Sequence, residues 1–139
     1  MCSAGGKLHA VRDKWAACFD ARGERQYKVQ LPLDSTESIG LDGGGRLYAR
    51  GYLDRGDRPR VIVRVGADGS LVETIARDRR EGGTVGREEL LRVAGDGTLY
   101  LFGYNGAVRV LEADGRVRTM TDRSREWERE EDAQRARNA

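Results

Sequence analysis

The stretch GRLYARGY at residues 45–52 returns as GTLYLFGY at residues 97–104, so the pattern G-x-L-Y-x-x-G-Y occurs twice. A second matching pair follows in the same order, with GADGSLV at residues 66–72 and EADGRV at residues 112–117. Self-similarity at a fixed spacing is the signature of a tandem repeat. The repeat predicts the architecture but leaves the chemistry open, because repeat folds host many functions.

A weaker copy of the repeat lies near the N-terminus, where GKLHAV at residues 6–11 and FDARG at residues 19–23 align with the two segments. In this alignment Gly23, Gly69 and Gly115 are 46 residues apart. That period is typical of propeller blades, each of which is a four-stranded sheet. The sequence therefore predicts three blade units.

The predicted fold is all-β, with about three tandem four-stranded antiparallel blade units that form an incomplete propeller-like array. Asp-Gly pairs between apolar runs are strong hairpin signals, and they occur at residues 68–69 and 114–115. Only Met1 and Cys2 precede the first turn, so the first unit is expected to lack an opening strand. The predicted repeat domain spans residues 1–121, with units at about 1–37, 38–89 and 90–121. In the middle unit, strands are predicted at 38–41, 46–52, 60–65 and 70–76. An insertion is predicted at 53–59.

Two further segments are expected to lie outside the strands. Residues 78–89 are rich in charge and read as a loop between units, in which residues 86–91 are the candidate for a helical turn. Residues 122–139 form a polar, charged tail, for which we expect a short helix or disorder. A helical tail is also a candidate cap for an open end of the array.

The order G-R-L-Y, a variable hinge, V-x-V, A-D-G and a final apolar strand resembles a blade of the NHL and SMP-30/gluconolactonase-like propellers. The resemblance covers most of residues 3–120. SMP-30-like enzymes bind a divalent metal through carboxylates and an asparagine on several blades, so the resemblance implies a metal-dependent lactonase-type hydrolase as one alternative. No such ligand set maps onto this sequence.

Composition limits the partners that the chain is expected to bind. The formal net charge is only +2, so no strong field favours nucleic acid or an anionic membrane. The sequence has no run of about 18 apolar residues and no signal peptide, so we expect no transmembrane segment. A cytoplasmic location is the default expectation, and secretion or a lipid anchor at Cys2 is the alternative.

Motifs for catalysis are missing, so an enzyme is the less favoured reading, and we expect neither a catalytic residue nor a cofactor nor a metal site. The single histidine, His9, aligns with Tyr48 and Tyr100 and reads as a strand residue. Cys2 and Cys18 are too few for a disulfide framework and are expected to be buried. The aspartates Asp42, Asp68, Asp96 and Asp114 fall at predicted turns, where bonds to the local backbone account for them.

Aromatic residues at repeated positions give the best candidates for ligand binding. Trp15, Tyr52 and Tyr104 could line a pocket on one loop face, with sugar as the ligand class, although packing within the blades is the simpler interpretation. Arg50 is the fourth candidate, since it belongs to an arginine-rich stretch at residues 50–64. That stretch reads first as a solvated face and second as a site for an acidic ligand.

The number of units suggests how the chain works. Propellers need roughly four to eight blades to close, and an open array leaves unpaired edges that invite association. Two chains could complete a six-bladed ring, the chain could be part of a longer propeller, or another element could cap the array. We therefore expect a non-catalytic interaction module that binds a protein partner or another copy of itself, with a glycan-binding module and a lactonase as the alternatives.

Overall fold

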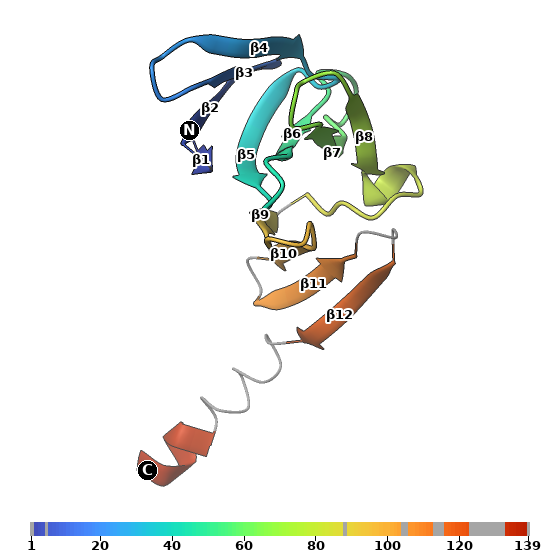
Figure 1. The fold of residues 1–139 in the computed structure, drawn as a ribbon. Helices are drawn as coiled ribbons and strands as arrows, with labels where there is room; N and C mark the ends of the chain where they lie inside the picture. The colour runs from blue at the N-terminus through green and yellow to red at the C-terminus, as the bar shows by residue number, and fades with distance from the viewer. Residues whose placement is uncertain are drawn as a thin grey trace.

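The computed structural model describes residues 2–4, 6–87, 89–103, 106–112, 116–122 and 133–138. These residues form three four-stranded antiparallel sheets, which follow one another in chain order (Figure 1). The predicted all-β array of three four-stranded units is confirmed. Within each sheet the strands pair in sequence order, as they do in a propeller blade.

Each sheet uses four consecutive strands of three to seven residues. The first sheet contains β1 (Cys2–Ala4), β2 (Lys7–Arg12), β3 (Trp15–Phe19) and β4 (Arg25–Gln30). The second contains β5 (Ser35–Leu41), β6 (Leu47–Tyr52), β7 (Arg60–Val65) and β8 (Val72–Arg77). The third contains β9 (Glu89–Val93), β10 (Leu99–Gly103), β11 (Ala107–Leu111) and β12 (Val117–Asp122).

The first sheet has an opening strand, so the expectation that it lacks one was wrong. β1 pairs antiparallel with β2 and places Cys2 opposite His9. The three residues of β1 are enough to pair with the start of β2. They form no apolar run, so nothing in the sequence pattern indicated a strand there.

The second sheet lies between the other two and is covered on both faces. On β7 the side chains alternate, as a strand requires, with Val61, Val63 and Val65 on one face and Ile62 on the other. The three valines pack in a core with the first sheet, and Ile62 packs in a core with the third sheet. This explains why β7 is apolar at nearly every position.

The core between the first and second sheets includes Ala16, Cys18 and Tyr27 from the first and Leu47 and Ala49 from the second. The ring of Tyr27 lies against the hairpin turn between β7 and β8, where a Cβ on Gly69 would overlap the ring. Gly69 also has a φ of 78°, which glycine adopts without steric cost. The predicted Asp-Gly turn is thus also a packing surface for the neighbouring sheet.

The core between the second and third sheets includes Tyr48 and Ile62 from the second and Leu91, Leu99 and Leu101 from the third. A backbone hydrogen bond joins the β5–β6 turn to the β9–β10 turn, because Gly43 N donates to Gly95 O at 2.8 Å. The opening strand β5 lies beside both β1 and β9. Side-by-side opening strands and face-to-face sheets make this a propeller-like arrangement.

The connection between β8 and β9 differs from the prediction. A short 3-10 helix, η1, spans Arg79–Glu81, and residues 89–93 are a strand paired with β10, so the expected helical turn at 86–91 was wrong. Asp78 accepts a hydrogen bond from Arg80 N and Gly82 ends η1 in the left-handed conformation. These cap residues decided the position of the turn.

The described part of the tail, residues 133–138, is helical and exposed at every position. It therefore buries no side chain against a sheet, and these residues do not cap an open face. Among the residues that the structure describes, no helix has the length and apolar character that a membrane span requires.

Candidate functional site

Two sheet faces at opposite ends of the array are the first candidate for a functional surface. We call the face of a sheet that is directed toward the preceding sheet its leading face, and the face directed toward the following sheet its trailing face. Both faces of the second sheet are covered. No further sheet among the described residues covers the leading face of the first sheet or the trailing face of the third.

The open leading face of the first sheet is apolar at its centre. Leu8 and Phe19 are direct cross-strand partners, and Ala10 is opposite Ala17 on the same face. Trp15 continues this row at the other end of β3. Leu8 is 40% exposed, and Trp15, at the opposite end of the strand pair, is 42% exposed.

The open trailing face of the third sheet is apolar as well. Phe102 lies opposite Leu90 on one side and Val108 on the other, and Tyr100 lies opposite Val110. Leu90 is 43% exposed and Phe102 is 40% exposed, whereas the two valines are buried. The exposed apolar part of this face is therefore the edge formed by Leu90 and Phe102, while Val108 and Val110 beside it are already covered.

A groove of about 670 Å³ lies at the edge of the open leading face. Its lining combines the apolar pair Leu8 and Phe19 with two charged groups, Lys7 and Asp20. The carboxylate of Asp20 is held by the turn, where it accepts hydrogen bonds from Arg22 N and Glu24 N at 2.9 Å. The groove thus has a fixed acidic group next to an apolar wall.

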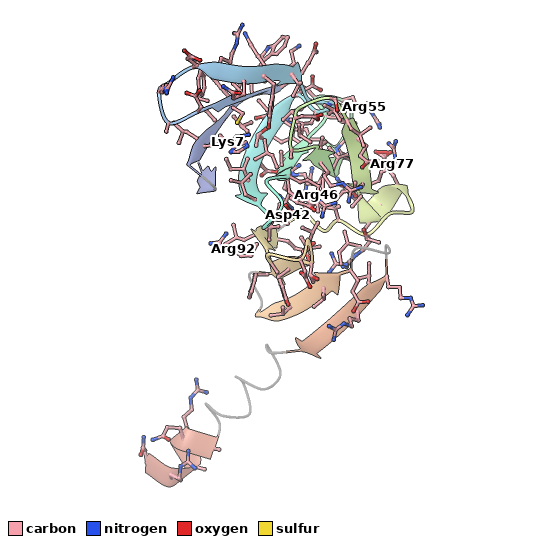
Figure 2. All side chains as sticks on the ribbon, in the orientation of Figure 1. Lys7, Asp42, Arg46, Arg55, Arg77 and Arg92 are labelled. Atoms are coloured by element: carbon pink, nitrogen blue, oxygen red, sulfur yellow. The ribbon has the colours of Figure 1, made fainter. Side chains whose placement is uncertain are left out.

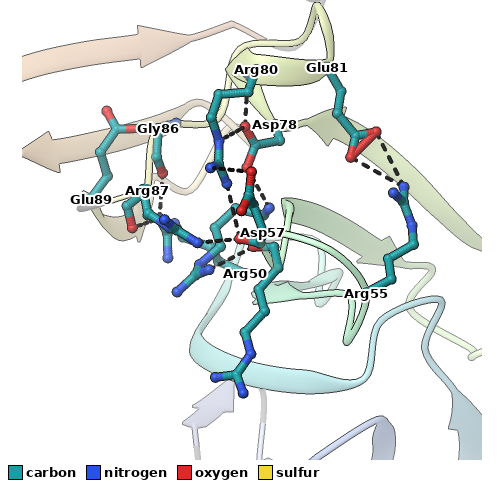
Figure 3. A network of polar contacts seen from close by, with 11 residues as sticks. Arg50, Arg55, Asp57, Asp78, Arg80, Glu81, Gly86, Arg87 and Glu89 are labelled. Carbon is teal, nitrogen blue, oxygen red and sulfur yellow. Dashed lines mark hydrogen bonds and ion pairs between the residues drawn. The ribbon is translucent and has the colours of Figure 1, made fainter.

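A polar network at the junction of the second and third sheets is the second candidate (Figure 3). Its centre is Arg50 on β6, which is only 2% exposed. The guanidinium donates to Glu37 Oε1 at 3.1 Å, to Gly86 O at 2.6 Å and to Arg87 O at 2.9 Å. Arg50 therefore holds the backbone of the β8–β9 loop from the second sheet.

The third sheet holds the same loop from the other side. Arg109 on β11 donates to Thr84 O at 2.6 Å and to both carboxylate oxygens of Glu89, at 2.6 and 2.9 Å. Glu89 in turn accepts a hydrogen bond from Gly86 N at 2.6 Å. Because two sheets hold one loop, the loop acts as a polar clasp between them.

The insertion of the second sheet joins this network. Asp57 in the insertion accepts hydrogen bonds from the guanidinium groups of Arg80 and Arg87 at its backbone oxygen. Arg55 pairs with Glu81 at 3.2 Å (Figure 3). A cavity of about 250 Å³ between the insertion and η1 is lined by Arg55, Asp57, Pro59, Asp78, Arg80 and Glu81. The charged part of the lining is two arginines and three carboxylates, and each carboxylate is ion-paired with one of the arginines.

Asp78 anchors the insertion to η1. Its two carboxylate oxygens accept hydrogen bonds from Arg60 N and Arg80 N, each at 2.8 Å. Burial opposes ionisation of Asp78, but these backbone bonds and the Arg80 guanidinium outweigh it, and the pKa lies below its ordinary value. Asp78 therefore serves as a structural carboxylate.

Asp42 is a second buried carboxylate, in the turn between β5 and β6 (Figure 2). Its Oδ1 accepts from Gly44 N and Arg46 N at 3.0 Å, and its Oδ2 accepts from Arg46 Nε at 2.7 Å and Tyr48 Oη at 2.9 Å. Burial opposes ionisation of Asp42, but the hydrogen bonds from Arg46 and Tyr48 prevail and lower the pKa. The turn prediction for Asp42 holds, and the side chain in addition fixes the ring of Tyr48.

Replacing Asp42 with asparagine is expected to lower the free energy of unfolding by about 2 kcal/mol at neutral pH, because charged acceptors make stronger hydrogen bonds. Since the folded-state pKa lies below the ordinary 3.8, this stability is present above about pH 4 and is lost as the pH falls through the folded-state pKa. Urea denaturation at several pH values measures it. The control is Asp96→Asn, a change in an exposed turn that should have a much smaller effect; equal effects would contradict the assignment.

His9 lies on β2 and is 1% exposed. Among the described residues, neither Nδ1 nor Nε2 has a hydrogen-bond partner, and the nearest ring, Tyr27, lies 6.2 Å away between centroids. Burial lowers the pKa of His9, and the charge of Lys7 lowers it further. Its cross-strand neighbour Cys18 is also buried, and burial raises the pKa of that thiol.

The stability of the chain is expected to fall as the pH decreases through about 6.5, because the unfolded chain binds a proton on His9 that the folded chain excludes. No other histidine is present to titrate in this range. His9→Leu should remove this decrease between about pH 7.5 and 5.5, while stability at the upper pH is unchanged or higher, because an apolar group replaces a buried polar one. Urea denaturation of both proteins tests this, and an unaltered pH profile in the variant would exclude His9 as its cause.

The residues predicted to bind a ligand lie in different surroundings. Trp15 belongs to the open leading face, where the Lys28 ammonium lies 4.9 Å from its ring centroid. Tyr52 lies at the end of β6, with the guanidinium carbons of Arg58 and Arg60 at 5.5 and 5.0 Å from its ring. Neither ring lines either of the two cavities above. Tyr104 and the turn at Asp114 lie outside the described residues.

The arginine-rich stretch at residues 50–64 is divided by the fold. Arg50 is buried, Arg60 and Arg64 are partly buried, and Arg55 and Arg58 are exposed. Arg64 pairs with Glu73 across the strands. Glu37 accepts hydrogen bonds from the side chains of Arg50 and Arg60. It was not singled out from the sequence, because it precedes these arginines by 13 and 23 positions.

Within the described ranges, no three His, Cys, Asp or Glu side chains lie close enough together to hold a metal ion. The carboxylates described above face arginines and backbone amides, which is the environment of structural groups.

Comparison with protein-family models found no match, and comparison with curated proteins found none either. Among solved structures, the chain is similar to the crystal structure of a putative 6-phosphogluconolactonase from Bacteroides fragilis, with a TM-score of 0.53 and 16% sequence identity. The match covers 86% of this chain and 36% of that chain. This chain thus spans about a third of the other protein's length, and at this identity the likeness concerns the fold alone.

Proposed function

We propose that this chain is a non-catalytic interaction module that binds a protein partner through its two open sheet faces. The supporting observation is that Leu8, Trp15, Leu90 and Phe102 are 40–43% exposed in two apolar patches at opposite ends of one array. Apolar patches on a sheet face are a usual sign of a protein–protein contact. The blade type that we propose for the sheets is that of the NHL and SMP-30-like propellers, on the strength of the G-x-L-Y and A-D-G segments.

The middle of the array gives these faces a rigid support. The second sheet is buried on both sides. The polar clasp, the β8–β9 loop bound by Arg50, Arg109 and Glu89, holds it to the third sheet. A rigid support reduces the entropy that is lost on binding. The end faces can therefore act as preformed surfaces.

Hydroxyl-radical footprinting tests this proposal. The purified chain is oxidised at a concentration at which light scattering shows a monomer, so that pairing with a second copy does not cover the faces. It is oxidised again in an extract of the cells that produce it, and the modification of each side chain is compared. We expect Leu8, Trp15, Leu90 and Phe102 to be protected in the extract. Leu71, which is 58% exposed and lies on the second sheet's hairpin, is the internal control and should be oxidised equally in both samples. Equal oxidation of all five side chains in both samples would contradict the proposal.

A further inference from the structure

We propose that the partner of the two open faces is a second copy of this chain, bound head to tail, so that two chains close a ring of six sheets. This inference rests on the proposed function and specifies its partner. In each contact the open trailing face of the third sheet in one copy covers the open leading face of the first sheet in the other.

Equivalent positions in the three sheets carry the first step. Leu8 and Phe19 are cross-strand partners on β2 and β3, as Leu47 and Val65 are on β6 and β7. Leu47 and Val65 are fully buried, because the preceding sheet covers them. The first sheet carries an equivalent apolar pair at the same register. Among the described residues, however, no preceding sheet covers its leading face.

The third sheet supplies a face of the required kind. Its trailing face carries Tyr100 at the position of Tyr48, opposite the buried Val110, and the exposed Phe102 opposite the buried Val108. In the second sheet the equivalent trailing face, which includes Tyr48 and Ile62, forms the core with the third sheet. Inside the array, the trailing face of one sheet always packs against the leading face of the next. The two open faces are one leading face, on the first sheet, and one trailing face, on the third.

The groove at the open leading face has a counterpart that is filled inside the array. Tyr27 of the first sheet lies against Gly69, in the hairpin turn of the second sheet. Gly23 occupies the equivalent turn of the first sheet and has nearly the same φ, 82° against 78°. A Cβ built on Gly23 meets nothing within 4 Å, and this glycine lines the open groove. The groove on the first sheet therefore corresponds to the site on the second sheet that the ring of Tyr27 fills.

The register identifies the side chain that would enter this groove. Tyr27 lies opposite Cys18, and the equivalent pair in the third sheet is Arg118 opposite Val110. Arg118 is exposed and bonded to Glu112 at 2.7 Å. The groove holds Asp20 beside Lys7, so the guanidinium of a second copy finds a fixed acidic group there. Each side of this contact carries one acidic and one basic group, Asp20 and Lys7 on the groove and Glu112 and Arg118 on the entering sheet, so opposite charges can face each other across it.

Ring closure fixes the number of copies. Propellers close with roughly four to eight blades. Two copies of the three sheets that the structure describes give six, within this range, and three copies give nine, outside it. A head-to-tail contact that closes on itself uses the same interface twice. The two contacts support each other, because the second forms within the complex already joined by the first.

Light scattering coupled to size exclusion, with a concentration series, tests the proposal. We expect the wild-type chain to have about twice the 15.4 kDa mass of one chain. Leu8→Glu on the leading face and Phe102→Glu on the trailing face should each raise the dimer dissociation constant ~100-fold, because a charge is buried in an apolar contact. Leu71→Glu, at an exposed apolar position away from both faces, should leave the dimer unchanged.

Mixing the two variants shows whether the contact is head to tail. The Leu8→Glu chain keeps an intact trailing face and the Phe102→Glu chain keeps an intact leading face, so the mixture should form a heterodimer although each variant alone is a monomer. One contact holds this heterodimer, so it should be weaker than the wild-type ring. Circular dichroism checks that the variants are folded. If either is not, Ala21→Trp, an exposed turn substitution at the groove, serves instead and should also give a monomer.

Three outcomes would overturn the inference: a wild-type chain that stays monomeric up to about 100 µM, a dimer that resists both charge substitutions, or folded monomeric variants whose mixture forms no heterodimer. A monomer whose end faces are nevertheless protected in the footprinting extract would overturn the second copy alone and leave the proposed function standing. A monomer without such protection would overturn both.

Discussion

Replacing Gly51 with alanine is expected to lower the free energy of unfolding by more than about 3 kcal/mol, enough to unfold a marginally stable chain. A Cβ at position 51 overlaps the carbonyl oxygen of Ser35 and comes within 3.0 Å of Thr36 Cα, so it meets backbone on the partner strand. That strand cannot simply move aside. The pairing of β5 with β6 already shifts register between Thr36 and Ser38, and Asp34 N donates to Tyr52 O at 2.9 Å.

Urea denaturation followed by circular dichroism measures this effect. The matched control is Gly95→Ala in the β9–β10 turn, where a Cβ meets nothing within 4 Å and the backbone does not have a positive φ. The control should change stability by no more than about 0.5 kcal/mol. If both variants unfold at the same urea concentration as the wild type, the close approach of β5 and β6 at Gly51 is not what the structure shows.

Replacing Arg50 with methionine is expected to lower the free energy of unfolding by about 3 kcal/mol. The aliphatic part of the side chain is retained. The carbonyl oxygens of Gly86 and Arg87 lose their donor, and Glu37 loses one of its two arginine partners and keeps the bond from Arg60. Buried acceptors that lose a charged donor cost about 1–3 kcal/mol each, reduced where the loop can turn toward water. The β8–β9 loop should also become more mobile.

Two measurements separate the effect of Arg50 from a general loss of charge. Urea denaturation gives the stability, and amide hydrogen exchange shows whether loop residues 83–87 exchange faster than the strands. Arg55→Met, at an exposed ion pair with Glu81, should cost less than about 0.5 kcal/mol. Arg50→Lys should restore only part of the stability, because an ammonium lacks the planar fork that reaches both carbonyls and Glu37. Full restoration by lysine would contradict the role given to the guanidinium.

The repeat made most of the fold predictable. Each blade-like sheet is set by local signals, namely an apolar strand before and after a glycine turn, and these recur with the same spacing. The failures occurred where local signals were weak. β1 is too short to show a period, and the turn η1 depends on the cap residues Asp78 and Gly82 within a stretch where charge was the dominant feature.

The candidate surfaces were only partly predictable. Trp15 was named from its aromatic ring, but its membership of an apolar face with Leu8 and Phe19 depends on strand register. Alternation along β2 and β3, combined with the number of units, could have revealed this face. The place of Arg50 could not be derived in this way, because its partners Glu37, Gly86 and Arg87 come from segments distant in sequence.

The central position of the second sheet has a consequence for how the chain unfolds. Repeat arrays behave as linear chains of coupled units, in which stability is the sum of unit terms and nearest-neighbour terms. In a single copy, and among the sheets that the structure describes, the first and third sheets each have one neighbour and the second has two. Detaching an end sheet therefore breaks one coupling, and losing the second sheet breaks both. Unfolding should therefore begin at the ends, and amide protons of β6 and β7 should exchange last. In a closed ring every sheet would have two neighbours, and this order of fraying would vanish.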